Sequence, residues 1–311
     1  MHIVFLDIDS VDCGDLDRSD LQRMGCVFYP STKPEQVVER LMQADIVITN
    51  KVGMDAPLLQ AAPKLKLICV CATGTNNIDL VRAQTLGIQV DNITQYCTES
   101  VAQHVFSLIL ALNTRLLDYH RDVRAGMWSS SDQFCRLDYP ITQLAGKVMG
   151  IVGYGVLGQA VAHLADAFGM SVLIAEALTC APASGRTPLT TVLTQADVVS
   201  IHCPLSDQSR NLIGADELAM MKSSALLINT ARGGIVHEQA LADALRHHHI
   251  RGAGFDVLSQ EPPPVDHPLL AQDLDNLLLT PHTAWASHQA RQNALDAVGC
   301  NIRRFLQLDD T

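Results

Sequence analysis

Short runs of hydrophobic residues alternate along the chain with longer segments in which hydrophobic residues recur at three- and four-residue steps. The short runs predict β-strands and the longer segments predict helices. The strands fall into two sets, 2–7, 26–29, 45–50, 65–72 and 88–91, then 147–152, 171–176, 197–202, 225–229, 252–257 and 276–280. Strands separated by helices form parallel sheets, and continuously hydrophobic runs are typical of strands covered on both faces. The pattern therefore predicts an α/β protein with two doubly wound parallel sheets.

One long helical pattern separates the two sets of strands. Thr98 is the expected N-cap, and hydrophobic residues at helical spacing continue from Val101 to Leu116. Segment 126–140 is richer in polar and aromatic residues, which predicts an irregular excursion and a candidate subunit interface. A last helix over 287–306 follows the second set of strands, and we expect it to return and cover the first sheet.

Length and charge narrow the class of protein. A chain of 311 residues exceeds what one hydrophobic core usually holds, which agrees with two domains. The formal net charge of −11 argues against a nucleic-acid or anionic-membrane partner. The chain starts with a predicted strand where a secretory signal would lie. Its most hydrophobic helical stretch, 101–112, is interrupted by polar residues and is shorter than a membrane span of about 20 residues.

The cysteines argue for a reducing environment. Nine cysteines are scattered singly apart from Cys69 and Cys71, and no pair of CxxC motifs is present. Several of them, including Cys203, lie inside hydrophobic runs. The spacing that zinc ligands need is therefore lacking, and we expect no metal. Buried free thiols favour a cytoplasmic location.

A glycine motif follows the first strand of the second set. The strand 147–152 runs directly into Gly153-Tyr-Gly155-Val-Leu-Gly158, and a helix follows. Glycines alone are weak evidence, but the order strand, GxGxxG, helix is what a dinucleotide site requires. Gly153 permits the tight turn, Gly155 lets the backbone approach a pyrophosphate, and Gly158 lets the helix pack close to the strand. The helix N-terminus then offers amide donors. The alternative is a purely structural glycine turn.

An acidic residue ends the next strand. Glu176 stands 18 residues after Gly158. A carboxylate there accepts hydrogen bonds from both ribose hydroxyls and repels a 2′-phosphate. Ala177 and Leu178 follow, where an NADP enzyme would carry a basic side chain, and Arg186 is too far along the chain to be placed. The sequence therefore favours NAD(H) over NADP(H), the alternative being a solvated surface carboxylate.

Four polar residues follow successive strands of the second set, namely Arg232, Asp256, Glu261 and His282. Ligands of such sheets bind beyond the carboxyl ends of the strands, so these side chains are expected to share a site. Arginine holds a carboxylate through its fork, and histidine delivers a proton near neutral pH. A neighbouring carboxylate such as Glu261 favours the imidazolium and fixes its orientation. The set predicts interconversion of a 2-oxo acid and a 2-hydroxy acid, although each residue taken singly has a structural alternative as a strand cap or turn residue.

At these residues the chain resembles the D-isomer-specific 2-hydroxyacid dehydrogenase family over nearly its full length. The similar motifs are Ala72-Thr-Gly-Thr-Asn-Asn-Ile-Asp79, Ser100-Val-Ala-Gln-His104, the glycine loop, His202-Cys-Pro-Leu205, Ile228-Asn-Thr-Ala-Arg-Gly-Gly234, Gly254-Phe-Asp-Val257, Glu261-Pro-Pro263 and Pro281-His282. The resemblance implies a Rossmann dinucleotide-binding domain, residues 99–283, inserted in a smaller flavodoxin-like substrate domain of residues 1–98 and 284–311. It also implies a homodimer formed through the dinucleotide-binding domain.

The resemblance assigns roles to individual residues. It implies Arg232, Glu261 and His282 as the catalytic set, with the backbone amides of Thr73 and Gly74 on the substrate carboxylate. Asp256 is implied near the nicotinamide carboxamide. The other cofactor contacts implied within the matching motifs are Tyr154, Val156, Leu157, Cys203, Pro204, Thr230 and Ala231, together with Arg232 and His282 themselves.

Residues 280–287 most resemble the glycerate dehydrogenase (hydroxypyruvate reductase) branch of the family. Trp285 would then wall a compact pocket for hydroxypyruvate or glyoxylate, the partners of D-glycerate and glycolate; a core or interface tryptophan is the alternative. The branch carries Arg-Lys where this chain has Ala177 and Leu178, which further disfavours NADP. Two rival functions stay open: a dehydrogenase for another 2-hydroxy acid such as D-lactate or phosphoglycerate, and an NAD(H)-sensing protein resembling the corepressors of this superfamily.

Overall fold

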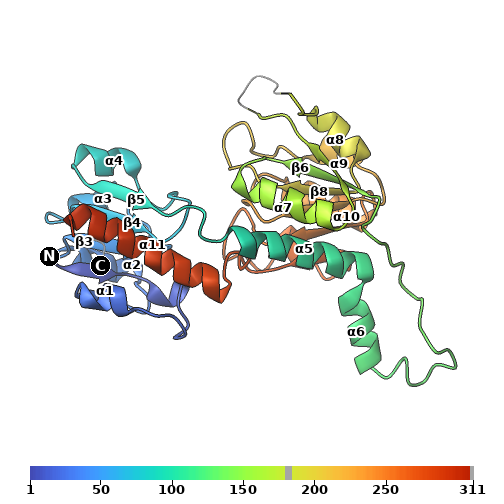
Figure 1. Cartoon of the computed structure of the whole chain (residues 1–311), viewed down its shortest axis with the longest axis horizontal. Helices are drawn as coiled ribbons and strands as arrows, with labels where there is room; N and C mark the ends of the chain where they lie inside the picture. The colour runs from blue at the N-terminus through green and yellow to red at the C-terminus, as the bar shows by residue number, and fades with distance from the viewer. Residues whose placement is uncertain (179–183, 309–311) are drawn as a thin grey trace. The chain divides into compact units, whose positions relative to one another are not determined.

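The computed structural model describes residues 1–178 and 184–308, and the chain forms two compact units (Figure 1). Unit 1 comprises Met1–Cys97 and Trp285–Thr311, and unit 2 comprises Thr98–Ala284. These boundaries lie within one residue of the domain boundaries that the resemblance implies. Each strand expected from the hydrophobic pattern is present; most are shortened at their ends, and the one expected over 88–91 is shifted by one residue to Gln89–Asn92.

Unit 1 is built on a five-stranded parallel sheet with the order β2-β1-β3-β4-β5. Its strands are β1 (Ile3–Phe5), β2 (Cys26–Phe28), β3 (Ile46–Thr49), β4 (Leu67–Val70) and β5 (Gln89–Asn92). A short 3-10 helix, η1 (Ile8–Ser10), follows β1. The helices are α1 (Ser19–Arg23), α2 (Pro34–Leu41), α3 (Ala56–Gln60), α4 (Leu80–Thr85) and α11 (His288–Leu306). The strand order is the flavodoxin-like order, as expected.

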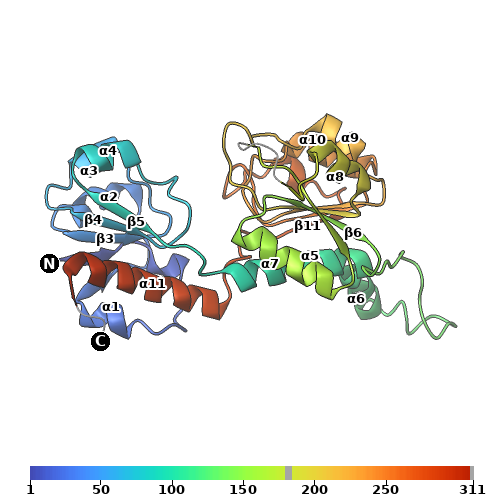
Figure 2. The same cartoon turned by 45° about the horizontal axis from the view of Figure 1, so that its top comes forward.

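The last helix, α11, returns to cover one face of this sheet (Figure 2). Its buried residues Leu295, Val298 and Ile302 pack with Ile3 and Phe5 of β1 in one hydrophobic cluster. Leu21 of α1 belongs to the same cluster, whereas buried residues of α2, α3 and α4 form a second one on the opposite face. The prediction that the last helix covers the first sheet is therefore confirmed.

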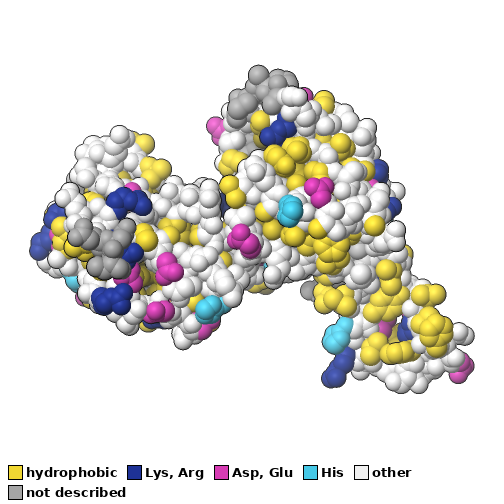
Figure 3. Space-filling model, in the orientation of Figure 1, with side chains coloured by type: hydrophobic (Ala, Val, Ile, Leu, Met, Phe, Trp, Pro, Cys, Tyr) yellow, Lys and Arg dark blue, Asp and Glu magenta, His cyan; other side chains and the backbone are white. Residues whose placement is uncertain are grey.

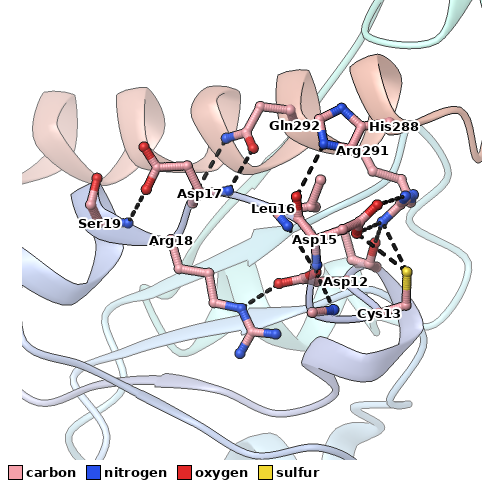
Figure 4. Close-up of polar contacts among 12 residues, drawn as sticks. Asp12, Cys13, Asp15, Leu16, Asp17, Arg18, Ser19, His288, Arg291 and Gln292 are labelled. Carbon is pink, nitrogen blue, oxygen red and sulfur yellow. Dashed lines mark hydrogen bonds and ion pairs between the residues drawn. The ribbon is translucent and has the colours of Figure 1, made fainter.

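Polar contacts fasten α11 to the loop that precedes α1 (Figure 4). The Arg291 guanidinium donates from Nη1 and Nη2 to the two carboxylate oxygens of Asp15, each over 2.7 Å. Gln292 accepts from the Asp17 N–H over 2.9 Å and donates to the Asp17 carbonyl. Paired hydrogen bonds thus join the loop before α1 to the start of α11, although the two segments lie far apart in the sequence.

Unit 2 is built on a six-stranded parallel sheet with the order β11-β10-β9-β8-β6-β7. Its strands are β6 (Val148–Val152), β7 (Ser171–Ile174), β8 (Val198–Ile201), β9 (Leu226–Asn229), β10 (Gly252–Phe255) and β11 (Leu277–Leu279). One face carries α5 (Thr98–Thr114) and α7 (Val156–Ala167), and the other carries α8 (Leu189–Gln195), α9 (Ala215–Met220) and α10 (Glu238–Arg246) (Figure 2). A second 3-10 helix, η2 (Pro268–Leu270), packs against α10.

The sequence pattern missed one feature of this sheet. Thr187 forms a single parallel bridge with Ala175 at the end of β7. This bridge stands where the third strand of a Rossmann sheet lies, so the sheet keeps the Rossmann order with that strand reduced to one pairing. No hydrophobic run marks residues 185–188, which is why the pattern did not predict a strand there.

The long helix predicted from Thr98 to Leu116 is confirmed except at its last two residues. The helix α5 ends at Thr114, Arg115 adopts the left-handed conformation (φ 52°), and α6 (Leu116–Arg124) starts as a separate helix. Helical spacing continues across the break, so the hydrophobic pattern could not reveal it. The irregular excursion predicted over 126–140 is confirmed, since those residues form neither helix nor strand. Within the described residues, no helix is both long and hydrophobic enough to cross a membrane.

Candidate active site

The glycine loop joins β6 to α7 with the geometry that the motif predicts. Gly153 has a φ of +95°, and a Cβ there would lie 2.4 Å from the Cys203 nitrogen. A Cβ on Gly158 would lie 2.1 Å from the Gly153 carbonyl oxygen, so α7 packs directly on the turn. Beside Gly155, in contrast, nothing lies within 4 Å of the Cβ position. The loop is closed on the protein side and open at Gly155, which fits a pyrophosphate at the N-terminus of α7.

A cavity of about 280 Å³ adjoins this loop within unit 2. The predicted cofactor residues that line it are Gly153, Tyr154, Gly155, Glu176, Cys203 and Pro204. Ala177, Leu178, Arg186, His202 and Ser206 also line it and were not predicted. Val156 and Leu157, predicted as contacts, are not among its lining residues and lie instead in the first turn of α7. The residues present fit the adenosine half of a dinucleotide.

Arg186, which the sequence could not place, enters this cavity. Its guanidinium carbon lies 5.1 Å from the centre of the Tyr154 ring, and Nη1 donates to the Ala175 carbonyl over 3.3 Å. Ala175 and Thr187 pair in a single parallel bridge. Their chain neighbours Glu176 and Arg186 are thereby brought together at the end of β7, although they are ten residues apart in the sequence. The cavity thus carries both a carboxylate, Glu176, and a cation, Arg186.

His202, after β8, lines the same cavity as a neutral side chain. Burial lowers the pKa of His202 to about 4. Its Nε2 lies 2.9 Å from the Ser200 hydroxyl, and within the described chain its buried Nδ1 has no hydrogen-bond partner. A positive charge is therefore absent from this ring at neutral pH.

The turn that carries Arg232 follows β9. The buried Asn229 side chain accepts from the Ala231 N–H over 3.0 Å and donates to the Arg232 carbonyl over 3.0 Å, which fixes the turn. A Cβ on Gly233 would lie 1.9 Å from the backbone of Leu258, so this turn presses against the loop after β10. The close contact explains why glycine follows Arg232, and it places Arg232 and the Glu261 loop at one sheet edge.

Glu261 and His282 form a short polar contact at this edge. His282 Nδ1 lies 2.6 Å from Glu261 Oε2, and Glu261 Oε1 accepts from the Leu258 N–H over 2.9 Å. The carboxylate therefore bridges its own loop and the imidazole. Because β10 and β11 are neighbours in the sheet, residues 21 positions apart meet here.

Asp256 holds the turn on which His282 stands. Its buried carboxylate accepts from the Thr283 N–H (2.9 Å), the Ala284 N–H (2.8 Å) and the Thr280 hydroxyl. The His282 N–H donates to the Asp256 carbonyl over 2.8 Å. His282 has a φ of +55°, a conformation that costs a non-glycine residue about 1–3 kcal/mol, so the turn must be held by its surroundings. His104 of α5 adds a contact from Nε2 to the Thr280 hydroxyl at 2.9 Å.

The remaining predicted residues lie as follows. Thr230 and Ala231 are buried in the turn after β9. Thr73 and Gly74 belong to unit 1, in the turn after β4, where the Thr73 carbonyl accepts from the Asn92 amide over 2.7 Å. Trp285, also of unit 1, packs edge-on against Tyr96 with ring centres 6.2 Å apart and contacts the core of that unit. Among the described residues, no group of three or more His, Cys, Asp or Glu side chains could hold a metal ion.

The fold and this edge of unit 2 define a class of protein, a dinucleotide-dependent oxidoreductase, whose sheet edge carries a hydrogen-bonded histidine–carboxylate pair. Comparisons with known proteins agree. The family model "D-isomer specific 2-hydroxyacid dehydrogenase, NAD binding domain" matches residues 106–284. The chain belongs to this family of NAD-dependent dehydrogenases.

Relatives cover nearly the whole chain. A glycerate dehydrogenase of Methylorubrum extorquens is 45% identical over 304 residues, which cover 98% of this chain and 96% of that protein. A hydroxypyruvate reductase of Blautia hydrogenotrophica is 36% identical, with 99% and 97% covered. Among solved structures, D-lactate dehydrogenase from Aquifex aeolicus, complexed with NAD and lactic acid, superposes with a TM-score of 0.84 at 27% identity, covering 98% of this chain and 96% of that one.

Proposed function

We propose that the protein reduces hydroxypyruvate or glyoxylate with NADH, giving D-glycerate or glycolate. The observation that carries the proposal is the 2.6 Å contact between His282 and Glu261 beside the Arg232 turn. The likeness to a glycerate dehydrogenase and a hydroxypyruvate reductase supports the choice of substrate. D-Lactate or phosphoglycerate as substrate is the nearest alternative.

Arg232 binds the substrate carboxylate through its guanidinium and polarises the adjacent carbonyl. Glu261 accepts the hydrogen bond of His282 Nδ1, which orients the ring and favours the imidazolium. His282 then transfers a proton from Nε2 to the carbonyl oxygen as C2 gains a hydride. NADH, when bound, supplies that hydride. The balance is 2-oxo acid, NADH and one proton to 2-hydroxy acid and NAD⁺.

The cofactor residues proposed are the glycine loop with Tyr154, Val156 and Leu157, and Glu176 for the ribose hydroxyls. Cys203, Pro204, Thr230, Ala231 and Asp256 complete the set. For the substrate, the family resemblance supports the Thr73 and Gly74 amides as carboxylate ligands and Trp285 as the residue that limits substrate size. The geometry within each unit is compatible with these roles.

The decisive experiment replaces His282 with asparagine. NADH oxidation is measured with hydroxypyruvate, glyoxylate, pyruvate and 3-phosphohydroxypyruvate, and NADPH is compared with NADH. Loss of the proton donor should lower kcat by about 10²–10⁴-fold, while NADH binding measured by fluorescence stays within about twofold. His247→Asn, an exposed histidine of unit 2, is the matched control. Unchanged turnover in His282→Asn would refute the catalytic assignment.

The same substrate panel separates the rival functions. Preference for pyruvate or 3-phosphohydroxypyruvate would reassign the substrate within the family. NADH binding with no turnover on any 2-oxo acid would favour the NAD(H)-sensing protein. The net charge of −11 supports the expectation of no nucleic-acid partner.

A homodimer formed through unit 2 is the proposed assembly. Segment 116–141 exposes a run of large hydrophobic side chains that a monomer would leave in water, and Figure 3 shows such a cluster over α6 and the loop after it. They are Leu116, Leu117, Val123, Met127, Trp128, Phe134, Leu137 and Ile141. Phe134, which is 89% exposed, is the residue to test. Phe134→Asp should convert a dimer to a monomer in light scattering, and a wild-type monomer would refute the proposal.

We also propose a cytoplasmic location. Cys13 and Cys300 are exposed free thiols, and the described cysteines form no disulfide. A membrane-impermeant maleimide should therefore label these two residues only after cells are lysed. Labelling in intact cells would place the protein outside.

A further inference from the structure

We infer that Glu238 is a positioning residue for the pair formed by Glu261 and His282, acting through the loop 257–261. The inference rests on the function proposed above. Glu238 is the first residue of α10, and neither the sequence pattern nor the family resemblance singled it out. Its carboxylate is largely buried, with 12% of the side chain exposed.

Three donors converge on the Glu238 carboxylate. The Ser259 N–H donates to Oε1 over 2.6 Å, and the Ser259 hydroxyl donates to Oε2 over 2.6 Å. His267 Nε2 lies 3.0 Å from Oε2. Hydrogen bonds to a charged acceptor are about twice as strong as neutral ones, so this carboxylate fixes Ser259 through both its backbone and its side chain.

The buried His267 holds the carboxylate from the other side. Its Nδ1 accepts from the Leu269 N–H over 3.2 Å as the cap of η2, so its proton must sit on Nε2. Nε2–H therefore donates to Glu238, and the neutral imidazole satisfies both contacts. The His267 ring thus connects η2 to the first residue of α10 through one hydrogen bond at each nitrogen.

The loop between these contacts carries Glu261. On one side Ser259 is tied to Glu238, and on the other Leu258 presses against Gly233 next to Arg232. The Leu258 N–H donates to Glu261 Oε1, which leaves Oε2 aimed at His282 Nδ1. The chain of contacts from Glu238 to His282 thus passes through two backbone N–H groups of one short loop.

A simpler role for Glu238 would be to cap α10 or to complement the helix dipole. The cap is already provided by His237, whose Nδ1 accepts from the Ala240 N–H over 3.2 Å. Both Glu238 oxygens instead point out of the helix to Ser259 and His267. The geometry therefore favours positioning of the loop over capping.

Glu238→Gln is the sharpest test because it keeps the shape and removes one acceptor. If the amide nitrogen replaces Oε1 it faces the Ser259 N–H, and if it replaces Oε2 it faces His267 Nε2–H. Either orientation sets donor against donor, so the loop must shift. Shifts of about 0.5 Å already weaken a catalytic constellation, and loss of such an outer contact typically costs 10–100-fold.

The experiment measures kcat, KM and their pH profiles for NADH-dependent reduction by wild type, Glu238→Gln and the matched control Glu217→Gln. Glu217 likewise sits in the first turn of a helix of unit 2 and accepts a backbone N–H, that of Gly214 over 2.9 Å, but it does not contact the loop. Glu238→Gln should lower kcat about tenfold and move the high-pH limb of kcat to lower pH, because a displaced Glu261 favours the imidazolium less. The KM for NADH should stay within about twofold. A merely structural residue would lower the melting temperature without moving the pH profile.

Ser259→Ala, which removes the hydroxyl and keeps the backbone donor, should have a smaller effect, and the double variant with Glu238→Gln should be less than additive. A wild-type pH profile and kcat in Glu238→Gln would overturn the inference. The His282 titration, followed by NMR in wild type and Glu238→Gln, tests positioning without any substrate. If wild type reduces no 2-oxo acid, the proposed function fails, whereas an unchanged His282 titration in Glu238→Gln overturns this inference alone.

Discussion

Both units are doubly wound parallel sheets, but the crevice at the switch point is filled by the protein in unit 1 and open in unit 2. In each sheet the crossovers diverge at a switch point, between β1 and β3 in unit 1 and between β6 and β8 in unit 2. In unit 1 the crevice is filled by the protein's own Asp7, whose buried carboxylate accepts from the Asn50 N–H (2.9 Å) and the Lys51 N–H (2.7 Å). In unit 2 the corresponding residue is Gly153, and a cavity of about 280 Å³ lies beside it.

The loop after β1 continues in the same manner. Asp12 accepts from the N–H groups of Gly14, Asp15 and Leu16 and pairs with Arg18, as Figure 4 shows. The backbone N–H groups around this switch point therefore donate to carboxylates of the chain itself, those of Asp7 and Asp12. The comparison shows that a doubly wound sheet provides the crevice, while the side chains of the first loop decide whether a ligand or the protein fills it.

The largest expected effect comes from a substitution in the glycine loop at the open switch point of unit 2. Gly158→Ala places a Cβ 2.1 Å from the Gly153 carbonyl oxygen, which must separate α7 from the loop. We expect NADH affinity, measured by fluorescence titration, to fall by about 100-fold or more, equivalent to about 2.7 kcal/mol. Gly155→Ala meets no protein atom within 4 Å, so it should fold normally and lose affinity only through contact with the cofactor. Wild-type affinity in both variants would contradict the phosphate loop.

A smaller effect is expected from disturbing the filled switch point. Asp7→Asn replaces one acceptor oxygen by an NH₂ group facing backbone N–H donors, which should lower the free energy of unfolding by about 1–3 kcal/mol. Trp285 is the tryptophan of unit 1, so urea unfolding is followed by its fluorescence in a Trp128→Phe background. Asp9→Asn, an exposed neighbour, is the control. A change of NADH affinity in Asp7→Asn would show that this crevice is not merely structural.

The smallest effect concerns pH. Burial lowers the pKa of His202 to about 4, below the unfolded value of 6.5, so the unfolded chain binds more protons between these values. The contribution of His202 to stability is therefore lost as the pH falls through this window. His202→Gln should flatten the loss by about 1–2 kcal/mol between pH 6.5 and 4 in urea titrations followed by Trp128 in a Trp285→Phe background. Equal slopes in wild type and variant would show that folding does not lower the pKa of His202.

The stability of unit 1 should fall at a lower pH than the window in which His202 destabilises unit 2. Burial opposes the charged form of Asp12, but hydrogen bonds from Arg18 and from the Gly14 and Asp15 amides outweigh it, and the pKa of Asp12 is lowered from 3.8. A carboxyl with a lowered pKa stabilises the fold above its unfolded pKa and loses that contribution as the pH falls through the folded one. The two switch points are thus expected to weaken in separate pH windows.

The local sequence pattern was sufficient to predict most strands, the glycine loop and the candidate catalytic residues. Hydrophobic runs revealed the central strands, such as β3 and β9, because strands buried on both faces need no polar face. The strand-to-helix context of Gly153, Gly155 and Gly158 predicted their geometry, because the steric requirement is local. Polar residues directly after strands pointed to Arg232, Glu261 and His282, because the carboxyl ends of parallel strands share one edge.

Tertiary structure decided what depends on distant pairing. Arg186 reaches the cofactor cavity only through the bridge of Thr187 with Ala175, and a single bridge leaves no periodic pattern. The break at Arg115 preserves helical spacing, so only its backbone conformation reveals it. Glu238 reads in sequence as an ordinary acidic residue at a helix start; its link to Glu261 exists because α10, η2 and the loop after β10 meet in space. Sequence determined which residues could do chemistry, and packing decided which of them are held in place to do it.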